Sequence, residues 1–257
     1  IILKEELDNG FQPPIERLQE VLSEEKIKAV ILISPDNPTG RVIERKTAKA
    51  LADLAIDHKF LIITDEAYRT LVYEGEHTYI YPLAPEHVVS LNAFSKDPGI
   101  PGWRLGFVYG PKEIIKKIKL VVSETVYCPP IIAQELVEIY LSDLEKADQF
   151  IKSVRQVYSS KRDLLIKAIQ EYIPKGKFVR PKGGMFVFLD LSEYLSDKKI
   201  GSEEFAKLLL EKKQVAVVPG SYFSRYYNYS IRLSFVTEEN ERIVEGVERI
   251  GELLSEL

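Results

Sequence analysis

Two short apolar runs separated by a helical pattern constrain the fold of this chain more than any other feature. Residues 29–33 read Ala-Val-Ile-Leu-Ile, and residues 60–64 read Phe-Leu-Ile-Ile-Thr. Uninterrupted runs of this kind are typical of strands buried on both faces, and the apolar spacing over 44–58 predicts a helix between them. A strand, a helix and a second strand in this order predict a right-handed crossover and therefore a parallel sheet.

The rest of the pattern predicts more of this sheet and then a second, smaller unit. Residues 111–172 are almost wholly helical in pattern, with a break at residues 128–130, and the stretch 144–172 is long enough to bridge two domains. The other elements expected are helices over 14–26, 202–213 and 238–254, and strands over 88–91, 105–109, 177–179, 185–189, 215–218 and 230–235.

These elements predict an α/β chain with three parts. We expect residues 1–143 to belong to a larger domain with a mostly parallel sheet, residues 144–172 to form a connecting long helix, and residues 173–257 to form a small α+β domain. No internal repeat or low-complexity segment interrupts this order.

The composition is that of an ordinary globular protein of 257 residues, with 45% hydrophobic and 29% charged residues. Its 35 basic and 39 acidic residues leave a net charge of −4 without a basic block, so we expect no nucleic-acid partner. No apolar run reaches the ~18–20 residues of a membrane span, so no membrane association is expected. The only cysteine, Cys128, fits a reducing, cytoplasmic compartment.

Two acidic residues, Asp65 and Glu66, directly follow the second apolar run. Such a pair can hold Mg²⁺ in nucleotide triphosphatases, but those proteins need a Gly-x-x-x-x-Gly-Lys-Ser/Thr phosphate loop. The nearest candidate, Gly40 to Thr47, has Arg45 at the second glycine position, where a side chain blocks the loop. Two interpretations remain, an acidic cap of the next helix and a ligand-binding carboxylate at the carboxyl edge of the sheet.

Further polar residues follow the other strands expected in this sheet. The turn 34–40 and the loop 92–104 should lie at the same carboxyl edge, where open α/β sheets bind ligands. A lysine held near an arginine and away from bulk water becomes a nucleophilic amine, and an arginine there can bind phosphate through its planar fork. The residues that this edge should collect are Asn37, Asp65, Tyr68, Ser95, Lys96 and Arg104.

Four sequence motifs occur in order along the chain. They are Ser-Pro-Asp-Asn-Pro-Thr-Gly at 34–40, Thr-Asp-Glu-Ala-Tyr at 64–68, Ser-Lys at 95–96 with Gly-Trp-Arg-Leu-Gly at 102–106, and Arg-Leu-Ser-Phe at 232–235. Each is weak alone, but the ordered set resembles the fold-type I, class I/II pyridoxal-phosphate aminotransferases over nearly the whole chain. This resemblance implies a three-layer α/β/α domain, partial in this chain, that binds pyridoxal 5'-phosphate, followed by a smaller α+β C-terminal domain.

The resemblance also implies a role for each matching residue. Lys96 would form a Schiff base with the cofactor aldehyde and then move the α-proton, while Asp65 would keep the pyridine nitrogen protonated. The remaining implied contacts are Tyr68 and Asn37 to the phenolate oxygen, Arg104 and Ser95 to the phosphate, and Arg232 with Asn37 to the substrate carboxylate. On the residues alone, Tyr68 could equally be a core residue, Asn37 a turn residue and Arg232 an exposed strand residue.

Two departures from the family pattern affect binding. Many members have a serine three residues before the lysine, where this chain has Ala93, so one phosphate hydroxyl is absent. Members specific for dicarboxylates often use an arginine near Cys128, whereas residues 125–132 contain none. The histidines at 58, 77 and 87 lack the spacing of metal ligands, so we expect no metal site.

The function implied by the resemblance is transfer of an amino group between an amino acid and a 2-oxo acid. A C–S lyase or a decarboxylase would use the same residues, and a cofactor-sensing regulator domain would need a DNA-binding module elsewhere, so these alternatives stay open. Members of the family are homodimers with an N-terminal part that carries a phosphate-binding glycine turn and a ring-stacking aromatic. We expect that part to be missing here, which should leave apolar sheet edges exposed.

Overall fold

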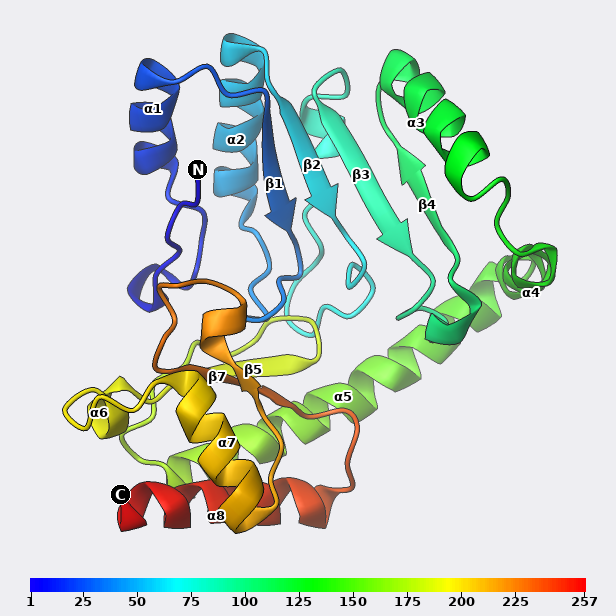
Figure 1. Ribbon diagram of the computed structural model, residues 1–257. Helices are drawn as coiled ribbons and strands as arrows, with labels where there is room; N and C mark the ends of the chain where they lie inside the picture. The colour runs from blue at the N-terminus through cyan, green and yellow to red at the C-terminus, as the bar shows by residue number, and fades with distance from the viewer.

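Two β-sheets, each with its own helices and its own hydrophobic core, make up the computed structural model, which describes residues 1–257 (Figure 1). The long helix α5 (Leu144–Tyr172) runs from beside the first sheet to the second. The α/β class predicted from the sequence is therefore confirmed.

The first sheet consists of β1 (Ala29–Ile33), β2 (Leu61–Asp65), β3 (Val88–Ala93) and β4 (Gly106–Tyr109), in that spatial order. The first three strands are parallel, as predicted, whereas β4 runs antiparallel to β3. A loop with the short 3₁₀ helix η3 (Pro101–Trp103) joins β3 to β4, without the α-helix that usually forms the crossover between parallel strands. The carboxyl ends of β1, β2 and β3 therefore share one edge with the start of β4.

Helices α1 (Ile15–Glu24) and α2 (Arg45–His58) cover one face of the first sheet. Successive side chains of a strand point to opposite faces, so Leu32 and Ile62 pack in the core with these helices while Ile31 is 74% exposed on the other face. The prediction that the first strand is buried on both faces is wrong, because no element of the chain covers the Ile31 side. Ile31 and Phe107, on the two edge strands of this sheet, both have exposed side chains.

The helical region predicted over 111–172 is confirmed and divides into α3 (Lys112–Thr125), α4 (Ile131–Leu141) and α5. The start of α5 is fixed by Asp143, whose side chain accepts a hydrogen bond of 3.1 Å from the backbone N–H of Lys146. None of the helices combines the length and the apolar character of a membrane span. Large apolar side chains are exposed on and between α3 and α4, namely Leu120, Val121, Val126, Tyr127, Ile131, Ile132 and Ile139.

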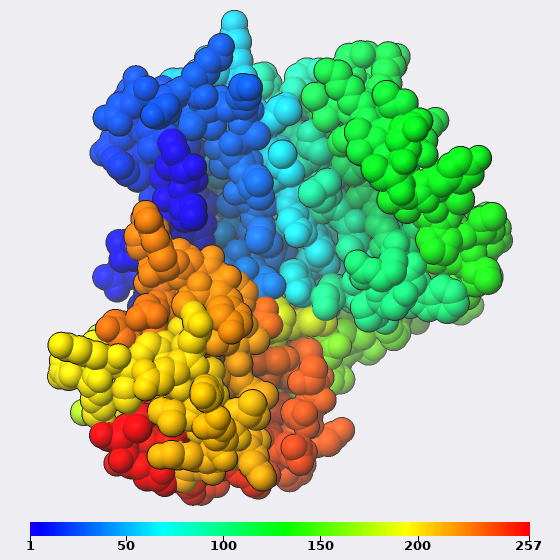
Figure 2. Space-filling view, viewed as in Figure 1, coloured from blue at the N-terminus to red at the C-terminus, as the bar shows by residue number.

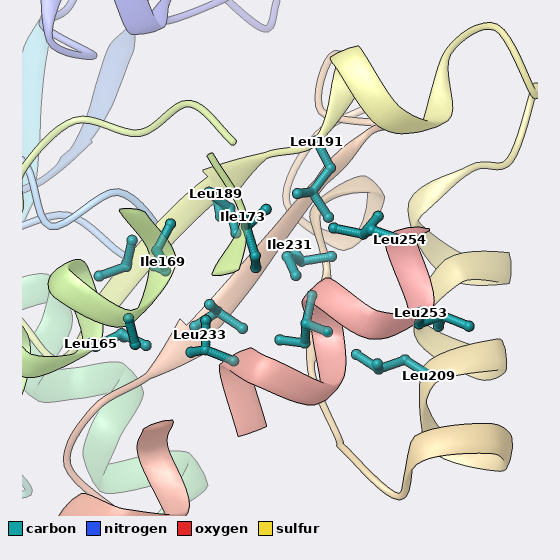
Figure 3. Packing of buried hydrophobic residues seen from close by; sticks show 14 of the residues in the cluster. Leu165, Ile169, Ile173, Leu189, Leu191, Leu209, Ile231, Leu233, Leu253 and Leu254 are labelled. Carbon is teal, nitrogen blue, oxygen red and sulfur yellow. The ribbon is translucent and has the colours of Figure 1, made fainter. Parts of the chain in front are cut away.

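The second sheet is antiparallel and has β7 (Ser230–Ser234) between β5 (Phe186–Asp190) and β6 (Val218–Pro219). Residues that alternate along β5 and β7, such as Leu189 and Ile231, pack against Ile169 of α5 in the core shown in Figure 3. The helices that complete this unit are α6 (Ser192–Leu195), α7 (Ser202–Lys213) and α8 (Asn240–Glu256). Further 3₁₀ helices are η1 (Leu7–Asn9), η2 (Tyr81–Leu83) and η4 (Gly220–Tyr222).

Two predicted strands are shorter than the sequence pattern indicates. Of residues 215–218, only Val218 belongs to a strand, because β6 pairs with β7 through Val218 and Pro219 alone. Residues 177–179 form a single bridge, between Lys177 and Asp190. In both places the apolar pattern is present but a neighbouring backbone is available for only one or two residues.

Backbone hydrogen bonds join the two sheets at a junction made by Gly40, residues 71–73 and residues 182–184. The carbonyl of Gly40 accepts from the N–H groups of Lys182 (3.0 Å) and Gly183 (3.1 Å), and the carbonyl of Leu71 accepts from Gly184 (2.9 Å). Figure 2 shows the part coloured yellow to red lying directly against the blue and cyan part. Gly40 has a φ of 69°, and a Cβ there would lie 2.5 Å from the Cβ of Pro181.

We predict that Gly40→Ala lowers the free energy of unfolding more than Gly75→Ala does. Both glycines have positive φ, but a Cβ at Gly75 meets nothing within 4 Å. Gly75→Ala should therefore cost only the left-handed backbone penalty of about 1–2 kcal/mol, and Gly40→Ala a clear additional amount from the clash with Pro181. Denaturant unfolding of the two variants measures this. Equal losses of unfolding free energy in the two variants would show that the backbone at the junction shifts to accommodate the Cβ without a further loss of stability.

Candidate active site

The turn that carries Asn37 is fixed by its own hydrogen bonds and by the neighbouring strand. The N–H of Ser34 donates to the carbonyl of Asp65 (3.0 Å), so the turn starts beside the end of β2. The carboxylate of Asp36 accepts from the N–H (3.1 Å) and from the hydroxyl (2.6 Å) of Thr39. Asn37 is thereby held half-buried at the sheet edge.

A buried arginine, Arg41, stabilises this turn through hydrogen bonds of its side chain. Its Nε donates to the carbonyl of Phe11 (2.9 Å), its Nη1 to the carbonyl of Ile33 (3.0 Å), and its Nη2 to the carboxylate of Glu5 (3.0 Å). Burial raises the pKa of Glu5 to about 7, although the charge of Arg41 acts in the opposite direction. The first residues of the chain are thus tied to the turn of Asn37.

Arg232, on β7, reaches across the junction to Asn37. Its Nη1 donates to Oδ1 of Asn37 at 2.7 Å, and this is the only hydrogen bond that the Arg232 side chain makes within the chain. The guanidinium carbon lies 4.1 Å from the centroid of the Phe186 ring and 5.1 Å from that of Phe223. Burial lowers the pKa of Arg232 from its usual value. The side chain is therefore oriented by two aromatic rings and keeps donors for an anion.

Asp65 and Tyr68 lie at the carboxyl end of β2 and on the turn that follows it. Oδ1 of Asp65 accepts from the N–H of Ala67 at 3.0 Å, and the carboxylate forms no ion pair. Tyr68 is half-buried with its ring edge-on to Phe186. Burial and the charge of Asp65 raise the pKa of Tyr68, with Arg232 acting against them. The Tyr68 hydroxyl is therefore a proton donor at neutral pH.

Lys96 lies on the loop between β3 and β4 and approaches Tyr68. Its Nζ is 5.5 Å from the centroid of the Tyr68 ring, and it makes no hydrogen bond or ion pair. The loop is anchored one residue later, where buried Asp97 accepts a hydrogen bond of 2.7 Å from the hydroxyl of Tyr140 in α4. A half-buried amine without an acidic partner is thus presented at the sheet edge.

The structure brings some of the predicted residues together and leaves others apart. Asn37 touches Arg232, Tyr68 touches Lys96, and Asp65 is near enough to act on the pKa of Tyr68. Arg104 is different, because it is exposed, has a φ of 52° and donates from Nη1 to the carbonyl of Pro101 at 2.9 Å. No side-chain hydrogen bond joins Arg104 or Ser95 to Lys96.

Sequence reasoning missed the two aromatic residues that flank Arg232. Phe188 pairs with Arg232 across β5 and β7, and Phe186, two residues earlier, faces the same side. The alternation of phenylalanines along the predicted strand 185–189 was a signal for this face. Phe223 gave no such signal, because it follows a 3₁₀ helix and reaches Arg232 only in the folded chain.

Comparison with known proteins identifies the family of this chain. The family model described as aminotransferase class I and II matches residues 3–250. The chain belongs to this family. It is 36% identical over 247 residues to the aspartate/prephenate aminotransferase of Thermus thermophilus, covering 96% of this chain and 61% of that protein. It is 30% identical over 253 residues to the aromatic-amino-acid aminotransferase 2 of Thermococcus litoralis, covering 97% and 62%.

Solved structures of the family show the same fold. Thermus thermophilus aspartate aminotransferase with maleate superposes with a TM-score of 0.88 at 35% identity, covering 96% of this chain and 62% of that one. The aromatic aminotransferase from Pyrococcus horikoshii gives a TM-score of 0.89 at 30% identity, covering 97% and 65%. The chain thus spans less than two thirds of the length of these relatives. The sequence-based recognition of the family and of its fold is confirmed.

The raised pKa of Glu5 predicts a pH dependence of stability. Between its usual value of 4.5 and about 7, Glu5 ionises in the unfolded chain but stays protonated in the folded one. Ionisation therefore favours unfolding, and stability should fall by up to about 1.4 kcal/mol per pH unit as the pH rises through this window. The free energy of unfolding is measured from pH 4.5 to 7.5 for the wild-type protein and for Glu5→Gln. In Glu5→Gln, the part of its decrease with pH that comes from Glu5 should be absent. Identical slopes for both proteins would contradict the assignment.

Proposed function

We propose that this chain carries the active site of a pyridoxal-phosphate-dependent aminotransferase that moves an amino group between an amino acid and a 2-oxo acid. The observation that carries the proposal is the unpaired amine of Lys96 over the Tyr68 ring, near the Arg232–Asn37 contact. An amine able to hold an aldehyde and a guanidinium able to hold a carboxylate are two of the groups that this reaction requires of the protein.

The residues at this edge fit the cofactor that the family uses. A pyridoxal ring offers an aldehyde, a pyridine nitrogen, a phenolate oxygen and a phosphate. Lys96 and Asp65 have no ion-pair partner within the chain, so an amine and a carboxylate are free for the aldehyde and the ring nitrogen. Arg104 also forms no ion pair, and its one hydrogen bond is to a carbonyl of its own turn, so donors remain for a phosphate.

Each residue then has a defined task toward cofactor and substrate. When bound, pyridoxal phosphate supplies an electron-withdrawing ring that stabilises negative charge on the substrate Cα. Nζ of Lys96 would hold the cofactor and, when released, take and return the proton of that Cα. The Asp65 carboxylate would hold the proton on the ring nitrogen. The Tyr68 hydroxyl, protonated at neutral pH, would donate to the phenolate oxygen.

The substrate and phosphate groups are assigned to the two arginines. Arg232 would bind the α-carboxylate with the donors it does not use on Asn37, and the Nδ2 of Asn37 stays available to the cofactor oxygen. Arg104 would bind the phosphate, with Ser95 as a second donor. Relatives named for aspartate and for aromatic amino acids suggest both as the first substrates to test.

The proposal also covers the oligomeric state, the cellular location and the domain organisation of the protein. We infer a homodimer, supported by the exposed apolar side chains of α3 and α4, and a cytoplasmic location, supported by the single free cysteine. Residues 1–143, 144–172 and 173–257 are proposed as part of the large cofactor-binding domain, the connecting helix and the small domain. Two separate hydrophobic cores and the 29-residue helix α5 support this division.

A substrate panel tests the reaction directly. The full-length gene product, loaded with pyridoxal phosphate, is mixed with aspartate, phenylalanine, glutamate or cysteine and with an acceptor 2-oxo acid that differs from the one derived from the donor, and the products are identified. We expect equal amounts of a new amino acid and of the 2-oxo acid derived from the donor. Ammonia with cleavage of a side-chain bond would indicate a lyase, and carbon dioxide would indicate a decarboxylase. No turnover despite bound cofactor would contradict an enzymatic function.

We predict that Asp65→Asn retains some cofactor but loses transamination by several orders of magnitude, because the ring nitrogen no longer keeps its proton. Initial rates with saturating cofactor measure the effect. Asp53→Asn, a change at an exposed acid paired with Lys49, serves as the matched control. Near-normal turnover in Asp65→Asn would assign the ring nitrogen to another acid.

We predict that Arg232→Lys raises KM for amino acids by about ten- to a hundredfold, because an ammonium group cannot form two parallel hydrogen bonds to a carboxylate. Arg225→Lys, at an exposed arginine beside Tyr226, is the control and should leave KM unchanged. Steady-state kinetics with each variant decide the matter. A KM for Arg232→Lys equal to that of the control would place Arg232 outside the substrate site.

A further inference from the structure

The residue next to Asp65 is a buried acid with no task in the proposed reaction. Glu66 is 2% exposed and lies at the end of β2. Its Oε1 accepts from the hydroxyls of Thr64 (3.1 Å) and Ser90 (3.3 Å), and its Oε2 accepts from the hydroxyl of Tyr109 (3.0 Å). A buried carboxylate is costly unless donors surround it, so this convergence calls for an explanation.

The donors come from three neighbouring strands in register. Thr64 of β2 pairs with Ser90 of β3, and Ser90 pairs with Tyr109 of β4. The three side chains therefore lie on one face of the sheet, and Glu66 closes the row. Its hydrogen bond to Tyr109 joins β2 to β4 across β3, which no backbone hydrogen bond can do. We call the contact between Glu66 and Tyr109 the strand clasp.

The charges around the strand clasp favour an ionised Glu66 and a protonated Tyr109. Burial alone would raise the pKa of Glu66, but His77 and the hydroxyl donors together hold it below its usual value. The Nε2 of His77 lies 4.0 Å from Oε1, and the His77 side chain is itself buried. Burial and the nearby Glu66 carboxylate raise the pKa of Tyr109 to about 12. The hydrogen bond is thus a charge-assisted one at neutral pH.

The strand clasp acts on the strand that leads from the loop of Lys96 and Arg104. That loop begins after β3 ends at Ala93 and returns into β4 at Gly106, so β4 fixes one of its two ends. β4 is an edge strand whose only partner is β3 (Figure 1). None of the residues of α3, the helix that follows β4, is buried. Apart from the backbone pairing through β3, β4 is held by side-chain contacts, among them Tyr81 against Tyr109 and Arg69 over Phe107, and the hydrogen bond of Glu66 is the one that ties it to the end of β2.

We propose that Glu66 is a positioning residue, which acts through Tyr109 to hold β4, and with it the loop of Lys96 and Arg104, in place beside Asp65. The inference rests on the proposed function in so far as that loop binds pyridoxal phosphate. The hydrogen-bond partners of the Glu66 carboxylate are protein hydroxyls, so no contact with cofactor or substrate is assigned to it. An amide at position 66 would place an N–H₂ donor on one side, where the facing hydroxyl would have to accept instead, and the charge-assisted hydrogen bond would become a weaker neutral one.

The test uses the full-length gene product as Glu66→Gln, Tyr109→Phe and the double variant. Tyr81→Phe is the matched control, because its ring packs edge-on against Tyr109 at 5.0 Å but its hydroxyl makes no hydrogen bond. The dissociation constant of pyridoxal phosphate is measured by absorbance titration, and amide hydrogen exchange is followed in the cofactor-free protein. Exchange reports on the strand clasp whether or not the cofactor binds.

We expect each single variant to bind pyridoxal phosphate about tenfold more weakly, and the double variant to be no weaker than the weaker single variant, because both changes break one contact. Exchange should rise about tenfold over residues 94–109 and stay unchanged in β1. The proposal would be overturned if the variants matched Tyr81→Phe in cofactor affinity and in amide exchange. It would also be overturned if the losses of cofactor affinity of the two single variants multiplied in the double variant.

If Glu66→Gln does not fold, Tyr109→Phe alone decides. A wild-type protein that binds no cofactor would refute the proposed function, and exchange would still judge the strand clasp.

Discussion

The carbonyl oxygen of Gly40 accepts two backbone hydrogen bonds, from Lys182 and Gly183, and these contacts hold the second sheet against the first. Asn37 lies three residues before that carbonyl, and Phe186 lies two residues after Gly184. The junction therefore sets the 2.7 Å contact between Arg232 and Asn37, which are 195 residues apart in the chain. A Cβ at Gly40 would displace this backbone, so a residue with no catalytic group determines the geometry of the site.

Two buried arginines of the framework differ in their pairing from the cations of the proposed site. Arg41 and Arg162 are buried and fully engaged, Arg162 with the carbonyl of Pro181 at 2.7 Å and with Glu74 at 2.9 Å. Removing a partner from either would leave a buried charge unsatisfied, so both belong to the framework. Lys96 has no partner, and Arg104 has only a carbonyl of its own turn. Their free donors are what the proposed cofactor site uses.

The sequence allowed the parallel pairing of β1 and β2 to be predicted, because strand and helix periodicities at residues 29–64 indicate a strand–helix–strand crossover, whereas the antiparallel direction of β4 was not predicted. It also allowed Asp65 to be placed at the sheet edge, since the carboxyl ends of parallel strands meet there. Arg232 could be selected only through the family motifs, because nothing local links it to Asn37. Glu66 and Phe223 escaped prediction because their partners come from other strands and loops. Residues 215–217 failed as a strand for the same reason, since an apolar pattern does not show which backbone is free to pair.

The central claim is that Lys96 is the amine that holds the cofactor. Borohydride reduction of the full-length gene product with pyridoxal phosphate, followed by proteolysis and mass spectrometry of the peptides, tests it most directly, because reduction fixes the cofactor to the amine that binds it. We expect one labelled peptide, containing Lys96, and no label in Lys96→Ala. A label on any other lysine, or labelling that persists in Lys96→Ala, would contradict it.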